Sequence, residues 1–214
     1  MTPTEVATAA RQKYNSVSDT FYSDAELLGL IFEKSTEMAM ECLVIEDTST
    51  AVTVASTSEY AWPTTALALK RVTVDSRKVF KIDDRDADKL NYYNAVTTIT
   101  GKPEHYWIFD RTLTFLPTPD AVYTIKYWFY AMPAAVTSVS TLSIPSQFHG
   151  DLVNGVVEEM CLKDENYEAA AVYGAKWIMG KKRATAWQAK QKRGDSFAVV
   201  KSEESLPNSI LGSG

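Results

Sequence analysis

The chain has 214 residues, of which 45% are hydrophobic and 23% charged, and its formal net charge is −5 at pH 7. This composition is typical of a globular protein with a sizeable core, and the acidic balance excludes a nucleic-acid binder of the usual basic kind. No apolar run approaches the ~20 residues that span a bilayer, and Met1 to Arg11 has no signal-peptide pattern, so we expect a cytosolic chain without a membrane partner.

The beginning of the chain reads as helical. Pro3 is expected to open a short helix that ends near Lys13, because proline is favoured at the first helical position. A second helix is predicted from Asp24 to about Leu43, where Ser23 is a good N-cap and Glu26 completes a capping box. Apolar residues recur along it at helical spacing, namely Leu27, Leu28, Ile31, Met38 and Cys42.

Strand composition follows. Serine, threonine, valine and alanine dominate from Val44 to Tyr60, which predicts strands and turns. The segments from Leu67 to Val74 and from Val79 to Ile82 are also strand-like. The acidic stretch from Asp83 to Leu90 is predicted to form a short helix.

The clearest strand signal lies after Gly101. Strands are predicted from Tyr106 to Phe109, from Thr112 to Leu116 and from Val122 to Ala131, with a proline-rich turn before the last. Short turns between them predict a three-stranded antiparallel meander. The last strand is apolar on both faces, so we expect it to be central or to lie at a subunit contact. Its candidate contact residues are Tyr123, Tyr127, Trp128 and Tyr130.

Two further helices and a tail complete the chain. Ser146 is predicted to cap a helix that runs to about Lys163, and the last helix is predicted from Tyr167 to Lys192, with Gly194 ending it. The segment from Asp195 to Gly214 has few large residues, and we expect it to be disordered in the free subunit. Apolar faces are predicted for Leu152, Val153, Val156, Val157 and Met160 in the first helix, and for Ala170, Tyr173, Trp177, Ala184 and Trp187 in the second.

This order of elements predicts an α+β fold. The N- and C-terminal helices are expected to form a helical bundle, with an antiparallel β-rich domain inserted between them. The predicted boundaries are residues 1–43 for the first helices, 44–143 for the β-rich domain, 144–193 for the last helices and 194–214 for a flexible tail.

No constellation of residues indicates catalysis. The two histidines, His105 and His149, are far apart, and the two cysteines, Cys42 and Cys161, stand alone on apolar helix faces, where we expect them to be buried and unpaired. No glycine-rich phosphate loop or nucleophile elbow is present, and the acidic run after Ile82 lacks the spacing of a calcium loop. We therefore predict no catalytic, cofactor or metal site, with a degenerate enzyme as a remote alternative. His149 is expected to pack over the β-rich domain.

Charge is segregated between two helices. The last helix has a basic face, whereas Glu168 is its one acid; the helix from Asp24 has Glu26, Glu33, Glu37 and Glu41 against Lys34. The two sets are expected to complement each other within or between subunits. Contact of the basic face with nucleic-acid backbone or an acidic partner stays open as an alternative. The basic face consists of Lys176, Lys181, Lys182, Arg183, Lys190, Lys192 and Arg193.

Several short motifs occur in one order: Tyr60-Ala61-Trp62-Pro63, the strand Leu69 to Val74, Gly101 to Trp107, Leu113 to Asp120, Tyr123 to Trp128, Met132-Pro133, and Ile144-Pro145 followed by His149, Asp151, Leu152 and Val153. Each motif is common on its own, but the ordered set is more specific. From Tyr60 to Lys192 the chain resembles the head-to-tail adaptor (connector) proteins of short-tailed bacteriophages.

The resemblance implies a structural virion protein without catalytic residues. It implies a homo-oligomeric ring of about a dozen copies in the neck, assembled in the host cytoplasm, that binds the portal protein and the tail nozzle or tube. Tail fibres are a further candidate partner, and double-stranded DNA would pass through the channel without sequence-specific contacts. The tail is expected to dock on the portal through Phe197, Val199, Val200, Leu206 and Ile210. Alternatives are another ring-forming tail or head-completion subunit, or a nucleic-acid-binding accessory protein.

Overall fold

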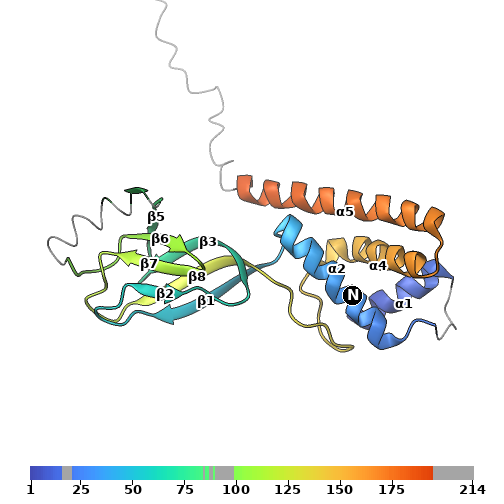
Figure 1. Ribbon diagram of the computed structural model, residues 1–214, viewed down its shortest axis with the longest axis horizontal. Coiled ribbons are helices and arrows are strands. Elements are labelled where there is room, and N and C mark those ends of the chain that lie inside the picture. The colour runs from blue at the N-terminus through green and yellow to red at the C-terminus, as the bar shows by residue number, and fades with distance from the viewer. Residues whose placement is uncertain (16–20, 84, 87–88, 90–98, 195–214) are drawn as a thin grey trace, which may run out of the picture.

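The computed structural model describes residues 1–15, 21–83, 85–86, 89 and 99–194. Helices at both ends of this part of the chain flank a region of strands, so the predicted α+β class is confirmed (Figure 1). We call the helices the helical part and the strands the strand part. No helix among the described residues is long and apolar enough to cross a membrane.

Local sequence explains the first two helices. The Thr2 hydroxyl accepts from the backbone N–H of Glu5, whose carboxylate accepts from the N–H of Thr2, so the capping box lies at the first helix, where sequence reasoning missed it. At the second helix only the Ser23 half is seen; the Glu26 carboxylate instead contacts Lys163, 2.5 Å away. The helices are α1 (Pro3–Tyr14), α2 (Asp24–Cys42), α4 (His149–Lys163) and α5 (Tyr167–Gly194), with a 3-10 turn, η1 (Ser146–Phe148).

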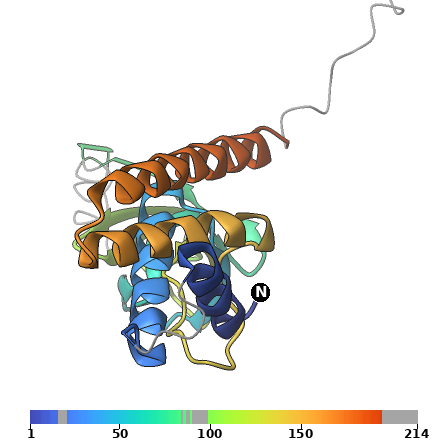
Figure 2. The ribbon, with the colours of Figure 1, turned by 90° about the vertical axis from the view of Figure 1, so that its right-hand side faces the viewer.

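Helix α4 lies at the centre of the helical part, with α5 on one side and α1 and α2 on the other (Figure 2). The apolar faces predicted for α4 and α5 are buried or half-buried in one shared core, which confirms that prediction. Ser146 is not the cap that was predicted, because it is the first residue of η1 and makes no side-chain capping bond.

The strand part forms two four-stranded sheets. One has the order β1-β8-β3-β4, and the other β2-β7-β6-β5, in which β5 and β6 are parallel and the other neighbours antiparallel. The strands are β1 (Glu46–Val52), β2 (Glu59–Ala61), β3 (Ala66–Val74), β4 (Arg77–Lys78), β5 (Phe80–Lys81), β6 (His105–Phe109), β7 (Thr112–Leu116) and β8 (Thr124–Ala131).

The predicted meander is wrong in its last strand. β6 and β7 do form an antiparallel hairpin, but β8 leaves their sheet and inserts between β1 and β3 of the other one. β8 is therefore a central strand, which explains why both of its faces are apolar. Its partners are distant in sequence, so the short turns around it do not determine its pairing.

A second core fills the space between the two sheets. Val72, Ile125 and Phe129 of one sheet pack with Leu113 and Phe115 of the other. Ile45 packs against both this core and that of the helical part, and its carbonyl accepts from the N–H of Ala131, so the two parts meet where α2 passes into β1. The helix predicted from Asp83 to Leu90 falls largely outside the described residues, as does the tail from Asp195.

Candidate assembly surface

Among the residues that the structure describes, no three His, Cys, Asp or Glu side chains are grouped to hold a metal ion. Cys42 and Cys161 are buried and unpaired, as predicted. Burial raises the pKa of both thiols, which disfavours the nucleophilic thiolate.

His149 lies in the helical part, so its predicted position over the strands is wrong. Its Nε2 donates to the carbonyl of Ile144 at 2.8 Å, and its Nδ1 is 2.9 Å from the α-amino nitrogen of Met1. Burial lowers the pKa of this imidazole, which favours the neutral ring that these two bonds require. His149 thus fixes the start of α4 against the preceding loop.

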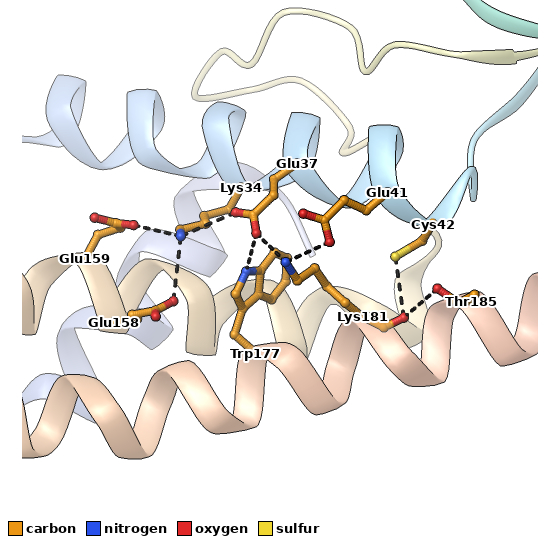
Figure 3. Close-up of polar contacts among 9 residues, drawn as sticks. All are labelled: Lys34, Glu37, Glu41, Cys42, Glu158, Glu159, Trp177, Lys181 and Thr185. Carbon is orange, nitrogen blue, oxygen red and sulfur yellow. Dashed lines mark hydrogen bonds and ion pairs between the residues drawn. The ribbon is translucent and has the colours of Figure 1, made fainter.

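The predicted basic face of α5 is divided between the inside and the outside of the helical part. Lys181 points inward, and its ammonium is 2.5 Å from a carboxylate oxygen of Glu37 and 2.8 Å from one of Glu41 (Figure 3). Arg183 contacts the buried carboxylate of Asp151 on α4. Lys181 therefore complements the acids of α2 within the subunit, which was one of the two predicted arrangements, whereas Arg183 pairs with an acid of α4 that was not part of the prediction.

Lys34 of α2 is the centre of this network. Its side chain is only 8% exposed, and its ammonium lies 3.4 Å from Glu37, 3.6 Å from Glu158 and 2.7 Å from Glu159. Burial acts to lower the pKa of Lys34, but the hydrogen bond to Glu159 and the three negative charges outweigh it and raise the pKa above its ordinary value. The lysine is therefore held as a cation between α2 and α4 (Figure 3).

Trp177 of α5 closes the network from the other side. Its indole N–H donates to Glu37 at 3.1 Å, and its ring centroid is 6.0 Å from the Lys34 ammonium. Burial acts to raise the pKa of Glu37, but the bonds from Lys181 and Trp177 and the charge of Lys34 hold it below its ordinary value. Sequence reasoning missed Glu158 and Glu159, because their partner lies on a helix more than a hundred residues away.

These contacts hold one face of α5 against α2 and α4 and leave the opposite face uncovered. Lys182 and Lys190 are exposed there and form no ion pair with any residue the structure describes, while the ammonium of Lys176 lies 4.7 Å from the ring centroid of Tyr173. The side chains of Lys192 and Arg193, which were part of the predicted basic face, lie outside the described residues.

The same uncovered face is apolar between its lysines. Val172, Ile178 and Met179 are 51%, 50% and 58% exposed. The positions 172, 175, 179, 182, 186 and 189 follow one another at alternating three- and four-residue spacing, which is the spacing of a helix-packing seam, and Ile178 lies beside this series. We call this the α5 outer face, and define it by Val172, Ala175, Ile178, Met179, Lys182, Ala186 and Ala189.

A groove runs beside this face. It has a volume of about 510 Å³ and lies between α5 and the C-terminal end of α2. Its walls are mainly apolar, and Lys181 and Lys182 flank it. The lining consists of Glu41, Cys42, Ile178, Lys181, Lys182, Thr185, Ala186 and Ala189.

A second uncovered face belongs to α2. Phe32 and Met40 are 39% and 57% exposed, and Glu33 beside them forms no ion pair with a described residue. Ala25, Gly29 and Thr36 share this side of the helix and are small. We call it the α2 outer face; sequence reasoning found its acids but not its apolar residues.

The four candidate contact residues of the strand part differ in how deeply they are buried. Tyr127 and Tyr130 are buried inside the subunit, where they stabilise its own sheet. Trp128 is half-buried, with the cations of Arg71 and Lys126 about 5 Å from its ring. Tyr123 is half-buried, and its hydroxyl donates to Asp120 at 2.6 Å. A subunit contact through Tyr123 and Trp128 stays a prediction.

The predicted portal-docking residues lie outside the described part of the chain, so their role is untested. They are Phe197, Val199, Val200, Leu206 and Ile210.

Comparison with known proteins identifies the family of this chain. None of the curated proteins matches this chain. The sequence profile of the SU10 adaptor protein family matches residues 1–200, which is nearly the whole chain. The chain therefore belongs to the SU10 adaptor protein family, a family of phage head-to-tail adaptors.

Proposed function

We propose that this structural protein of the phage neck assembles as a ring beneath the portal, joins the capsid to the tail, and continues the channel through which DNA passes. Family membership supports the role of adaptor. The observation that carries the ring is the α5 outer face, which exposes three large apolar side chains on a helix whose opposite face is packed in the core. An exposed apolar strip of this kind on a rigid element is typical of a surface that another protein covers.

Each part of the chain would have its own role in the assembly. The helical bundle, residues 1–43 and 144–193, would line the channel and contact the portal. The inserted β-rich domain, residues 44–143, would face outward or toward the tail nozzle or tube. The tail, residues 194–214, would dock on the portal through its apolar residues. A ring of about a dozen copies fits the proposal, because a head-to-tail contact between unlike surfaces closes into a ring when the rotation between neighbouring copies divides a circle.

Electron microscopy of the full chain mixed with purified portal tests this function. We expect an added ring under each portal, with the number of copies given by the mass of the complex. Absence of any portal complex would overturn the proposal. Rings that form equally well without portal, and that do not bind it, would instead indicate another tail or head-completion subunit.

Deletion of Asp195 to Gly214 tests the docking segment separately. The described residues form two cores of their own, so we expect an unchanged circular dichroism spectrum and loss of portal binding. Portal binding by the truncated chain at full affinity would contradict the proposed role of the tail.

One observation favours a second candidate, a nucleic-acid-binding accessory protein. Lys176, Lys182 and Lys190 are exposed along one side of α5. If they bind phosphates, a mobility shift with short duplex DNA should weaken steeply as salt is raised, because each phosphate contact releases counterions.

A further inference from the structure

We propose that the α5 outer face binds the α2 outer face of a second copy of this chain. The inference rests on the proposed ring and names the surfaces that would build it. It also assigns the lysines of the α5 outer face to a protein contact rather than to DNA.

The first step is the chemistry of the α5 outer face. Ile178 and Met179 are each at least half exposed, and Lys182 follows them one turn later on the same side. Alanines at 175, 186 and 189 fill the remaining positions, so a partner helix would approach closely. A surface that only bound phosphate would need the lysine but would gain nothing from the isoleucine and methionine.

The second step compares pairing of this face with itself to pairing with another surface. A two-fold contact with parallel helices, or with helices that cross near Lys182, would bring Lys182 and Lys190 of each copy toward the same lysines of the other. Like charges at a buried contact are unfavourable, and no acid lies among the residues that define this face. A different surface that supplies carboxylates would match these lysines without such repulsion, and we infer that the partner surface is of this kind.

The third step identifies that surface. The α2 outer face combines exposed apolar side chains, Phe32 and Met40, with the carboxylate of Glu33, which forms no ion pair to a described residue. Phe32 is bulky where the α5 outer face is lined by alanine, and Glu33 has the charge opposite to Lys182. The groove of about 510 Å³ beside Ile178 would take an apolar side chain of the partner.

The fourth step is geometry. Within one copy, α5 packs against the inner side of α2 through Lys181, Glu37 and Glu41, so the α5 outer face and the α2 outer face are separate exposed surfaces of the helical part. A contact between these two faces would therefore leave a free α5 outer face on one copy and a free α2 outer face on the next. Such a contact between unlike surfaces propagates from copy to copy, and it closes when the rotation between copies divides a circle.

The first experiment alters charges on the two outer faces of the full chain and measures ring formation after mixing with portal. Met179→Asp and the pair Lys182→Glu with Lys190→Glu should each abolish ring formation on portal while the circular dichroism spectrum stays unchanged. Adding Glu33→Lys to the double lysine variant should restore at least part of the rings. Val139→Asp, at a loop residue that is 87% exposed, is the matched control and should assemble normally.

The second experiment is cross-linking between two tagged copies. We expect a bis-maleimide reagent to join a Met179→Cys chain to a Phe32→Cys chain in the assembled ring, and neither variant to itself. The native Cys42 and Cys161 are buried and should react slowly. Joining of Met179→Cys to itself would overturn the unlike-surface contact.

The outcomes separate this inference from the proposed function. Wild-type rings on portal, combined with unchanged assembly of the Met179→Asp and lysine variants, would overturn the assigned surfaces and leave the adaptor function standing. Failure of the wild-type chain to bind portal would overturn the function itself. Normal assembly of the lysine variants with loss of a salt-dependent DNA mobility shift would assign the face to DNA and overturn the inference.

Discussion

The two faces of α5 differ more than the sequence of that helix suggests. On the inner face, Trp177 is 2% exposed and Lys181 contacts two carboxylates. One residue further on from each, Ile178 is half exposed and Lys182 contacts no described acid. A step of one residue turns a helix by about 100 degrees, so neighbouring lysines have unrelated environments. The difference teaches that the charge count of a helix does not reveal which of its charges remain available to a partner.

The largest effect should come from truncating Trp177. Trp177→Ala would leave a large cavity between α2, α4 and α5 and remove a hydrogen bond to Glu37, so we expect a loss of about 3–5 kcal/mol in the free energy of unfolding. Urea denaturation would measure it. Ile178→Ala, one residue away on the outer face, should stay within about 0.5 kcal/mol of the wild type. Equal losses of unfolding free energy in the two variants would contradict the difference between the inner and outer faces of α5.

Removing the buried lysine should have the next largest effect. Lys34→Met keeps the volume of the side chain but leaves Glu37, Glu158 and Glu159 close together without their shared cation, which should cost about 3 kcal/mol of unfolding free energy. Thermal and urea denaturation at neutral pH would measure it. Lys182→Met is the matched change on the outer face, and a comparable loss there would contradict our account.

Two glycines allow the packed and the exposed helix faces to be compared by adding a single methyl group. A Cβ at Gly180 would lie 2.6 Å from Cβ of Asp151, so Gly180→Ala should push α5 off α4 and cost about 1–3 kcal/mol, despite its better helix propensity. Gly29 on the α2 outer face has no atom within 4 Å of a Cβ. Gly29→Ala should therefore stabilise the isolated chain by about 0.5–1 kcal/mol, measured by the same denaturation.

The smallest expected effect is a pH dependence from Glu37. Its pKa is held below the ordinary 4.5, so the folded state favours the ionised carboxylate. The stability that this contributes is complete above about pH 4.5 and is lost as the pH falls through the lower value in the folded protein. Denaturation between about pH 6 and about pH 3 should show a shallower loss of stability toward acid for Glu37→Gln than for the wild type. An identical slope would contradict the pairing.

Sequence patterns predicted the helices well, because their signals are local. The starts of α1 and α2, the end of α4 and the buried face from Leu152 to Met160 all follow from proline, capping residues and apolar spacing. The pairing of β8 could not be predicted from local signals, because its partners β1 and β3 are distant in the chain. Its apolar pattern fits any central strand position.

The candidate site was only half predictable for the same reason. The segregation of charge between α2 and α5 is visible in the sequence, but which lysine finds a carboxylate depends on how the helices are rotated against one another. Lys181 and Lys182 are neighbours in sequence, and the packing of the inner face of α5, including Trp177 against Lys34 and Glu37, places Lys181 toward the carboxylates. The exposed Ile178 and Met179 were missed because the inner apolar face accounted for the helical pattern.

Oxidative footprinting of methionines tests the central claim most directly. Met179 and Met40 lie on the two outer faces and are both more than half exposed in the free chain, so hydroxyl radicals should oxidise them readily. In the portal-bound ring our account predicts that both become strongly protected, because each copy covers the α5 outer face of its neighbour with its α2 outer face. Oxidation of Met179 at the same rate in the ring as in the free chain would contradict it.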